Sequence, residues 1–243
     1  MKCLFRGLSD PGLVRSDNQD TYYIDPQKRF CIVADGMGGH AGGQEASRLA
    51  AHAIRDCLDE HWMSDQPSKD LLQLSIQKAN QAILEDQASH PDRSDMGTTA
   101  LVVVFRANQA WCAHIGDSRL YRYRDHSLEQ VTEDHTWVAR AMKLGDISSE
   151  EARVHPWRHI LSQCLGRADL QPADVVPFDW QAGDRLLLCS DGLTEELSDS
   201  LIAEYLSASD DEQTVSNLVN AAKQNGGRDN ITAVIVVYHS PEH

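Results

Sequence analysis

The chain has 243 residues, of which 41% are hydrophobic and 24% are charged, and its formal net charge is −15. This composition is typical of a globular protein and excludes wholesale disorder. Because binding to a nucleic-acid backbone or to an anionic membrane surface depends on lysine and arginine, the charge argues against both kinds of partner. The sequence contains no repeat or linker that would divide it, so we expect a single domain over residues 1–243.

Hydrophobic periodicity predicts groups of strands and pairs of helices along the chain. The expected strands are residues 22–24, 30–34, 99–105, 110–115, 119–124, 173–178, 184–189 and 230–238. The expected helices are residues 44–62, 68–89, 136–144, 148–153, 198–207 and 212–224. Since the elements do not alternate one by one, the pattern predicts an α+β fold with sheets packed together and paired helices outside them.

The N-terminal segment carries Arg6 and Asp10 where an export signal needs an apolar stretch, so we expect a cytoplasmic protein. The longest apolar runs, Ala100 to Phe105 and Ala233 to Tyr238, are far shorter than the ~20 residues of a membrane span. Six cysteines would allow a disulfide framework, but no two lie closer than 25 residues. Reduced, mostly buried thiols are the interpretation that we favour.

Five aspartates lie where predicted strands begin or end, and four of them have a glycine within one or two residues. They are Asp20, Asp35, Asp117, Asp191 and Asp229. Aspartate and glycine often mark turns without any further role. Five such positions in one chain favour a second interpretation, in which the carboxylates converge on one site.

If the carboxylates converge, their mutual repulsion must be offset by protonation or by bound cations. Two charges about 4 Å apart repel by ~4 kcal/mol at an effective dielectric constant near 20, and whole domains are stable by only ~5–15 kcal/mol. Ligands that are all oxygen select Mg²⁺ or Mn²⁺ over zinc. Two such ions sharing one carboxylate can lower the pKa of a bridging water and hold a phosphoryl group for in-line attack, so the residues predict a two-metal hydrolase.

Other chemistries have less support in the sequence. Residues 36–41 match the dinucleotide fingerprint, but Asp35 would face the pyrophosphate, and no second strand ends in an acid ~20 residues further on. No cysteine is followed six positions later by arginine, which excludes one class of thiol phosphatase. The chain also contains no Gly-Lys-Ser/Thr phosphate-binding loop and no Gly-x-Ser-x-Gly motif.

Six motifs, in order, resemble those of the metal-dependent protein phosphatases (PPM family, type 2C). They are Arg15 to Asp20 (RSDNQD), Val33 to His40 (VADGMGGH), Met96 to Thr99 (MGTT), His114 to Arg119 (HIGDSR), Ser190 to Leu193 (SDGL) and Gly227 to Asn230 (GRDN). The resemblance runs from about residue 5 to residue 238. It is strongest to minimal bacterial members, and among these to the cyanobacterial phosphatases that act on the phosphorylated PII signalling protein.

The resemblance implies a four-layer αββα fold, in which two mostly antiparallel sheets form a β-sandwich between helix pairs. It implies hydrolysis of phosphoserine and phosphothreonine in proteins, including PII as a candidate, by a metal-bridging water and without a covalent intermediate. Nothing in the sequence indicates obligate assembly, so we expect a monomer. The alternative is a phosphoprotein-binding pseudophosphatase, which would lack a metal ligand; none is missing here.

The resemblance also assigns ligands to two core ions, Mg²⁺ or Mn²⁺. Asp35 would bridge both ions, and Asp191 and Asp229 would bind the first. The Gly36 carbonyl and, directly or through water, Asp20 would serve the second ion.

Four further assignments follow from the same resemblance. Asp117, together with Asp191, would hold a third, weaker ion. Arg15 would bind the substrate phosphate, and His40 would protonate the leaving alkoxide. Asn230 would orient a metal ligand.

Residues 135–170 are polar and rich in histidine and tryptophan, and they resemble the mobile flap that family members carry beside the site. Around 134–137 and 155–159 they are bulkier and more aromatic than common bacterial forms. Since exposed aromatic residues often anchor interfaces, we expect Trp157 and His159 to select the protein substrate. The alternative is that both pack into a small core of the flap.

Overall fold

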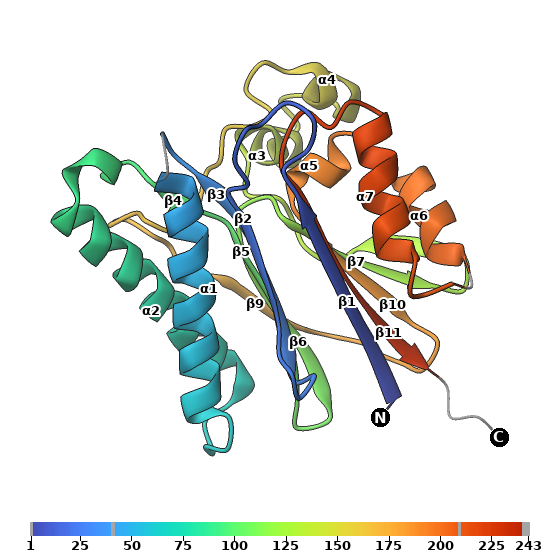
Figure 1. Ribbon diagram of the computed structural model, residues 1–243, viewed down its shortest axis with the longest axis horizontal. Coiled ribbons are helices and arrows are strands. Elements are labelled where there is room, and N and C mark those ends of the chain that lie inside the picture. Colours follow the sequence, from blue (N-terminus) through green and yellow to red (C-terminus); the bar gives the residue numbers. More distant parts are fainter. Residues whose placement is uncertain (1, 40–41, 209, 240–243) are drawn as a thin grey trace.

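Two antiparallel β-sheets form the centre of the computed structural model, which describes residues 2–39, 42–208 and 210–239 (Figure 1). In spatial order, one sheet consists of β1 (Lys2–Asp10), β11 (Ile231–His239), β10 (Arg185–Cys189), β7 (Arg119–Arg124) and β8 (Ser127–Gln130). The other consists of β2 (Asp20–Ile24), β3 (Phe30–Met37), β5 (Ala100–Arg106), β6 (Gln109–Ile115) and β9 (Asp174–Phe178), with the short β4 (Gly97–Thr98) paired to β3.

Helix pairs cover the outer faces of both sheets (Figure 1). On one side lie α1 (Gly42–His61) and α2 (Ser68–Ser89). On the other lie α6 (Asp199–Ser207) and α7 (Thr214–Gln224), preceded by the short α5 (Asp191–Thr194). This arrangement confirms the expected α+β fold with four αββα layers.

The continuous apolar strands supply two hydrophobic layers at once. Ile32 and Val102 pack against α1 and α2, whereas their neighbours Val33 and Val103 pack between the sheets. Successive side chains of a strand point to opposite faces, so a strand covered on both faces must be apolar throughout. A third layer lies between the first sheet and α6 and α7, and includes Ile202 and Leu218.

The observed elements agree with the predicted strands and helices to within three residues at each end. The sequence analysis did not predict β1, β4, β8, α5 or the 3-10 turn η1 (Pro91–Arg93). β1 is an edge strand of the sheet, and five of its nine residues are polar or glycine, so its hydrophobic alternation is weak. Nine register pairs with β11 nevertheless hold it in place.

The segment 135–170, called the flap segment below, contains α3 (Trp137–Leu144) and α4 (Ser149–Val154) and lies next to α5 (Figure 1). Thr136 caps the start of α3, where its hydroxyl accepts a hydrogen bond from the Ala139 amide, and Gly145 caps the end with a left-handed φ of 80°. α4 begins with a complete capping box formed by Ser148 and Glu151.

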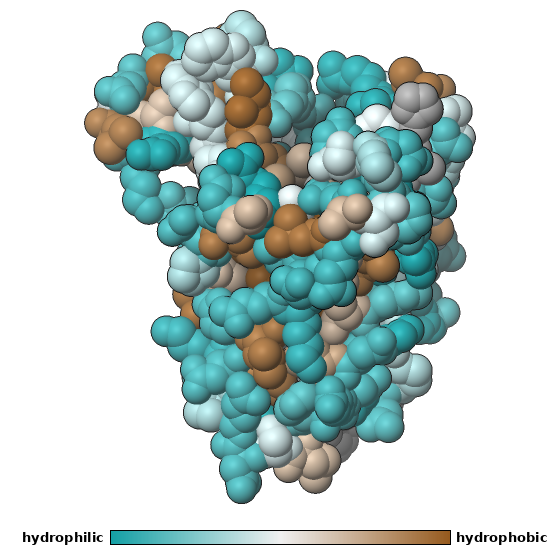
Figure 2. Space-filling view, turned by 90° about the vertical axis from the view of Figure 1, so that its left-hand side faces the viewer, coloured by the Kyte–Doolittle hydropathy of each residue, from teal (hydrophilic) through white to brown (hydrophobic). Residues whose placement is uncertain are grey.

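All six cysteines are free thiols, as expected. Among the described helices, none combines the length and the hydropathy that crossing a membrane requires. The side of the molecule shown in Figure 2 is hydrophilic over most of its area, and hydrophobic residues appear there in separate small groups.

Candidate metal centre

The strand ends bring the predicted aspartates to one cavity of about 810 Å³. Asp35, Asp117, Asp191 and Asp229 all line this cavity. Asp20 lies directly behind them, because it is the register partner of Asp35 in the β2–β3 pair. The structure therefore unites five positions that span more than 200 residues of sequence.

The carboxylate of Asp20 is buried, and only one of its two oxygens has a hydrogen-bond partner among the described residues. Its Oδ2 accepts a hydrogen bond of 2.7 Å from the Ser190 hydroxyl, and the Ser190 oxygen in turn accepts one of 3.0 Å from the Thr232 amide. Its Oδ1 is buried and has no hydrogen-bond partner among the described residues. An unpaired buried carboxylate oxygen is costly, which points to a cation or an ordered water at this position.

The position of Asp35 is fixed through its backbone. Its amide donates to the Thr99 hydroxyl at 2.9 Å, and its carbonyl accepts from the Thr98 hydroxyl at 2.8 Å and from the Thr99 amide at 2.9 Å. The Thr99 hydroxyl also shares a bond of 2.7 Å with Ser118, which follows Asp117. The motif threonines thus join two of the carboxylate-bearing segments and leave the Asp35 carboxylate to face the cavity.

Burial and mutual repulsion disfavour the charged forms of these carboxylates. Burial raises the pKa of Asp20 to about 6. Burial, followed by the charges of Asp20, Asp191 and Asp117, raises the pKa of Asp35 well above its usual range. The pKa of Asp117 is raised by burial and then by the charge of Asp191. The pKa of Asp191 is raised by burial and then by the charge of Asp229. Hard divalent cations would relieve this repulsion, so the donor set fits Mg²⁺ or Mn²⁺.

Gly36 is required by a close backbone contact. A Cβ atom at this position would lie 2.0 Å from the Gly43 carbonyl oxygen and 2.6 Å from that of Gln19. The Gly36 amide donates to the Gln19 carbonyl at 3.2 Å. Only glycine lets the start of α1 approach the end of β3 so closely.

Arg15 and Asp229 form the rim of the cavity. The Arg15 guanidinium contacts Asp229 at 2.8 Å, and this hydrogen bond, followed by the charge of Asp229, raises the pKa of Arg15. Asn230 holds the loop that carries Arg15: its Oδ1 accepts from the Gln19 amide at 2.8 Å, and its Nδ2 donates to the Pro11 and Asp17 carbonyls. Asn230 therefore positions the loop between β1 and β2.

Of the remaining predicted residues, His40 lies outside the described residues. His159 lines the cavity, and its Nδ1 lies 2.5 Å from Oε1 of Glu195. Trp157 stands edge-on to Trp137, with ring centroids 5.0 Å apart, and is 51% exposed. The structure thus separates the two flap residues, with one facing the cavity and the other in an exposed aromatic cluster.

The sequence analysis missed Glu195. It lies four positions after Asp191, at the end of α5, so its backbone amide donates to the Asp191 carbonyl at 2.8 Å. Burial, followed by the charge of Asp191, raises the pKa of Glu195 to about 7. The signal for Glu195 in the sequence is its position four residues after the predicted ligand Asp191. This spacing brings the two side chains together only in a helical turn, which the sequence analysis did not predict.

A family model described as Protein phosphatase 2C matches residues 12–231. The chain belongs to the protein phosphatase 2C family. This confirms the family to which the six motifs pointed.

Curated relatives of this family member are bacterial phosphatases. It is 39% identical over 234 residues to the "Serine/threonine protein phosphatase PstP" of Mycobacterium tuberculosis, a match that covers 95% of this chain and 44% of that protein. The chain therefore spans less than half the length of that relative. It is 35% identical over 237 residues to the "Serine/threonine phosphatase stp" of Listeria monocytogenes, covering 94% of this chain and 93% of that protein.

Solved structures share its fold over nearly the whole length. The crystal structure of the Mycobacterium tuberculosis phosphatase PstP/Ppp matches with a TM-score of 0.91 at 36% identity and covers 98% of this chain and 99% of that one. The catalytic domain of PstP in complex with two manganese ions matches with a TM-score of 0.87 at 34% identity, covering 98% and 99%.

Proposed function

We propose that this chain is a metal-dependent phosphatase that hydrolyses phosphoserine and phosphothreonine in proteins. The observation that carries the proposal is the convergence of five aspartates and Arg15 around one cavity. Membership of the phosphatase 2C family supports it, as does the relative whose catalytic domain binds two manganese ions.

The residues present fit two core ions, Mg²⁺ or Mn²⁺. Asp35 would contact both ions, Asp191 and Asp229 the first, and the Gly36 carbonyl and Asp20 the second. When bound, such ions lower the pKa of a coordinated water and neutralise the phosphoryl oxygens, so that water displaces the alkoxide in line. We further propose a third, weaker ion held by Asp117 and Asp191.

The phosphate would be oriented by Arg15. A guanidinium has five N–H donors in a planar fork, and the contact with Asp229 uses only one edge of it. Asn230 fixes the loop beneath this arginine. By resemblance, His40 would give its proton to the leaving alkoxide.

Substituting Arg15 by alanine should weaken substrate binding more than turnover. The guanidinium would hold the phosphate in both the ground state and the transition state, so its loss should raise KM, by about tenfold or more, with a smaller fall in kcat. Steady-state kinetics on a phosphopeptide measure both constants. Arg6→Ala is the matched control, because Arg6 also forms an exposed ion pair, with Glu212. A fall in kcat at unchanged KM would contradict the role of Arg15 in binding.

The exposed aromatic cluster of the flap segment would contact the protein part of the substrate. Trp137 stacks on His155 with ring centroids 4.8 Å apart, and Trp157 stands edge-on to both rings. Trp137 and Trp157 remain 36% and 51% exposed, and Ile160 beside them is 50% exposed. The rings are therefore preorganised by each other and still accessible, as an anchor requires. His159, on the cavity wall, would contact the residues next to the phosphate.

Trp157→Ala should lower kcat/KM on a phosphoprotein at least several-fold more than on an aryl phosphate, because only the protein substrate reaches the cluster. Parallel kinetics on both substrates give this ratio. Met63→Ala is the control, since Met63 is 91% exposed and lies in the turn after α1, away from the flap segment. An equal loss on both substrates, together with a lower Tm, would favour a packing role for Trp157.

The proposed function is tested by titrating Mg²⁺ or Mn²⁺ into the metal-free protein and following hydrolysis of an aryl phosphate and a phosphopeptide. Phosphopeptide binding without turnover at every metal concentration would support the pseudophosphatase instead. The phosphorylated PII protein is the candidate substrate that the sequence resemblance offers, and it belongs in the same assay. The cytoplasmic location and the monomeric state stay predictions from the sequence.

A further inference from the structure

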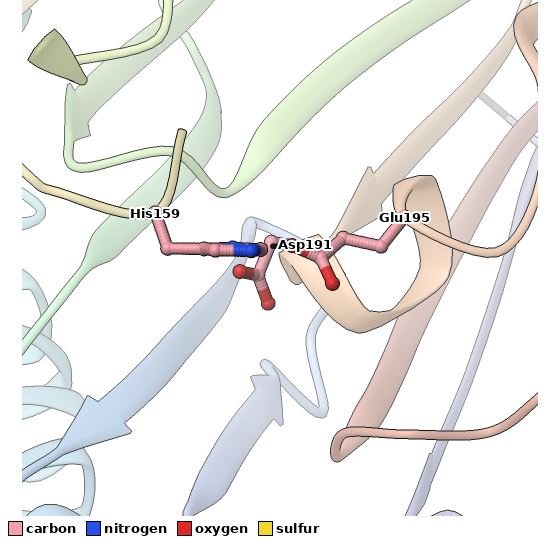
Figure 3. A group of neighbouring side chains, drawn as sticks. All are labelled: His159, Asp191 and Glu195. Carbon is pink, nitrogen blue, oxygen red and sulfur yellow. Dashed lines mark ion pairs between the residues drawn. The ribbon is translucent and has the colours of Figure 1, made fainter. Parts of the chain in front are cut away.

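Three side chains of residue types that can ligate metals meet where the flap segment approaches α5 (Figure 3). His159 comes from the flap segment, Asp191 begins α5, and Glu195 directly follows it. One ligand atom of each residue lies within 4.8 Å of those of the other two. His159 Nδ1 and Glu195 Oε1, joined by the ion pair drawn in Figure 3, are 2.5 Å apart.

We propose that His159, Asp191 and Glu195 bind a transition metal ion of the Zn²⁺ class, and that this ion fastens the flap segment to α5. This inference rests on the proposed function in one respect: Asp191 is also a proposed ligand of the core ions. It differs from the third, weaker site expected at Asp117 and Asp191, which has oxygen ligands alone.

The donor set selects the kind of ion. One imidazole nitrogen and two carboxylate oxygens suit Zn²⁺, Co²⁺ and related ions, whereas Mg²⁺ takes oxygen ligands and keeps most of its waters. Three protein ligands leave a fourth position open in a tetrahedral site. His159 and Asp191 both line the cavity, so that position would face the space in which the substrate phosphate would bind.

The surroundings of Glu195 favour a cation at this point. Its side chain is only 25% exposed, and the described ion pairs and hydrogen bonds give its carboxylate the imidazole of His159 as its partner. Asp191 adds a second carboxylate whose ionised form is disfavoured by burial. The His159 ring, by contrast, is 43% exposed, so an ion can enter from solvent.

An ion at this site would add an anchor to the middle of the flap segment. The segment is already held near its ends, where the His135 amide donates to the Gly116 carbonyl and the Leu165 amide donates to the Thr98 carbonyl, both at 2.8 Å. His159 lies between these two anchors. Coordination would therefore fix the part of the flap segment that borders the cavity.

Cobalt is the probe for this site, because its visible absorption reports coordination by imidazole. Co²⁺ is titrated into the full chain in saturating Mg²⁺, which keeps the core positions filled, and both absorption and tryptophan fluorescence are followed. Trp157 lies two residues before His159, within ~7 Å along the chain, so bound Co²⁺ should quench its emission. Zn²⁺ should then displace the cobalt and restore the fluorescence.

His159→Gln and Glu195→Gln should each weaken Co²⁺ binding at least about tenfold, so that both signals are largely lost at the Co²⁺ concentration that half-saturates the wild type. His155→Gln is the matched control: it removes another flap histidine, which stacks on Trp137, and it should bind Co²⁺ as the wild type does. Wild-type Co²⁺ affinity and spectrum in the folded His159→Gln and Glu195→Gln proteins would overturn the inference. Mg²⁺-dependent hydrolysis of an aryl phosphate by the wild type, measured separately, decides the proposed function independently.

Discussion

Asp35→Asn should lower turnover by about 10²- to 10⁴-fold. Asp35 is the carboxylate proposed to contact both core ions, and metal ions supply several kcal/mol of charge stabilisation in such reactions. Each ~1.4 kcal/mol lost from that stabilisation is a tenfold fall in rate. The fold should persist, because Asp35 is held through backbone bonds to Thr98 and Thr99 that asparagine also makes.

The measurement is kcat on an aryl phosphate and a phosphopeptide over a range of Mn²⁺ concentrations, with circular dichroism to verify the fold. Asp95→Asn is the matched control, since Asp95 lies on the wall of the same cavity but outside the carboxylate cluster. Its loss should change turnover far less than the loss of Asp35. Hydrolysis near the wild-type rate by Asp35→Asn in excess chelator would exclude the two-metal proposal.

The aspartates proposed as metal ligands could be predicted because their chemistry is visible locally. Each stands where a predicted strand begins or ends, and a turn aspartate has no reason to recur five times in that position. The strands themselves were predictable because both of their faces are covered, as for Ile32 and Val33, which leaves long apolar runs. The pairing of the strands in the sheets, which places Asp20 opposite Asp35, could not be predicted because it depends on the sheet register.

Other features could not be predicted because they depend on distant partners. β1 is stabilised by its register with β11, from the far end of the chain, and its own pattern is weak. The contact of His159 with Glu195 joins residues that are 36 positions apart, with β9, β10 and α5 between them, so it depends on how these elements pack. The role of Ser190 is likewise invisible in its motif, since it acts through a hydrogen bond to Asp20.

The carboxylate cluster should also make the stability of the metal-free protein depend on pH. Burial raises the pKa of Asp20 to about 6, and burial together with neighbouring carboxylates raises that of Asp35 further. Above pH ~4 the unfolded chain releases these protons, while the folded chain retains them up to the raised pKa values. The folded state then binds more protons than the unfolded state, so the cluster's contribution to the free energy of unfolding falls as the pH rises through this window.

Divalent ions should therefore restore stability most strongly above the raised pKa values. An ion present at a concentration of about 100 times its Kd adds ~2.7 kcal/mol to the free energy of unfolding. A chain of this size gains ~2–4 °C in Tm per kcal/mol. Mn²⁺ should therefore raise Tm by roughly 5–10 °C at pH 8 and by less at pH 5. Metal-free Asp35→Asn should melt above the metal-free wild type at pH 8, because one repelling charge is gone, yet gain less from Mn²⁺. Thermal melts with chelator or Mn²⁺ at both pH values test this. If the metal-free wild type is as stable as Asp35→Asn at pH 8 and its Tm does not rise with Mn²⁺, the carboxylates neither destabilise the metal-free fold by repulsion nor bind the ions.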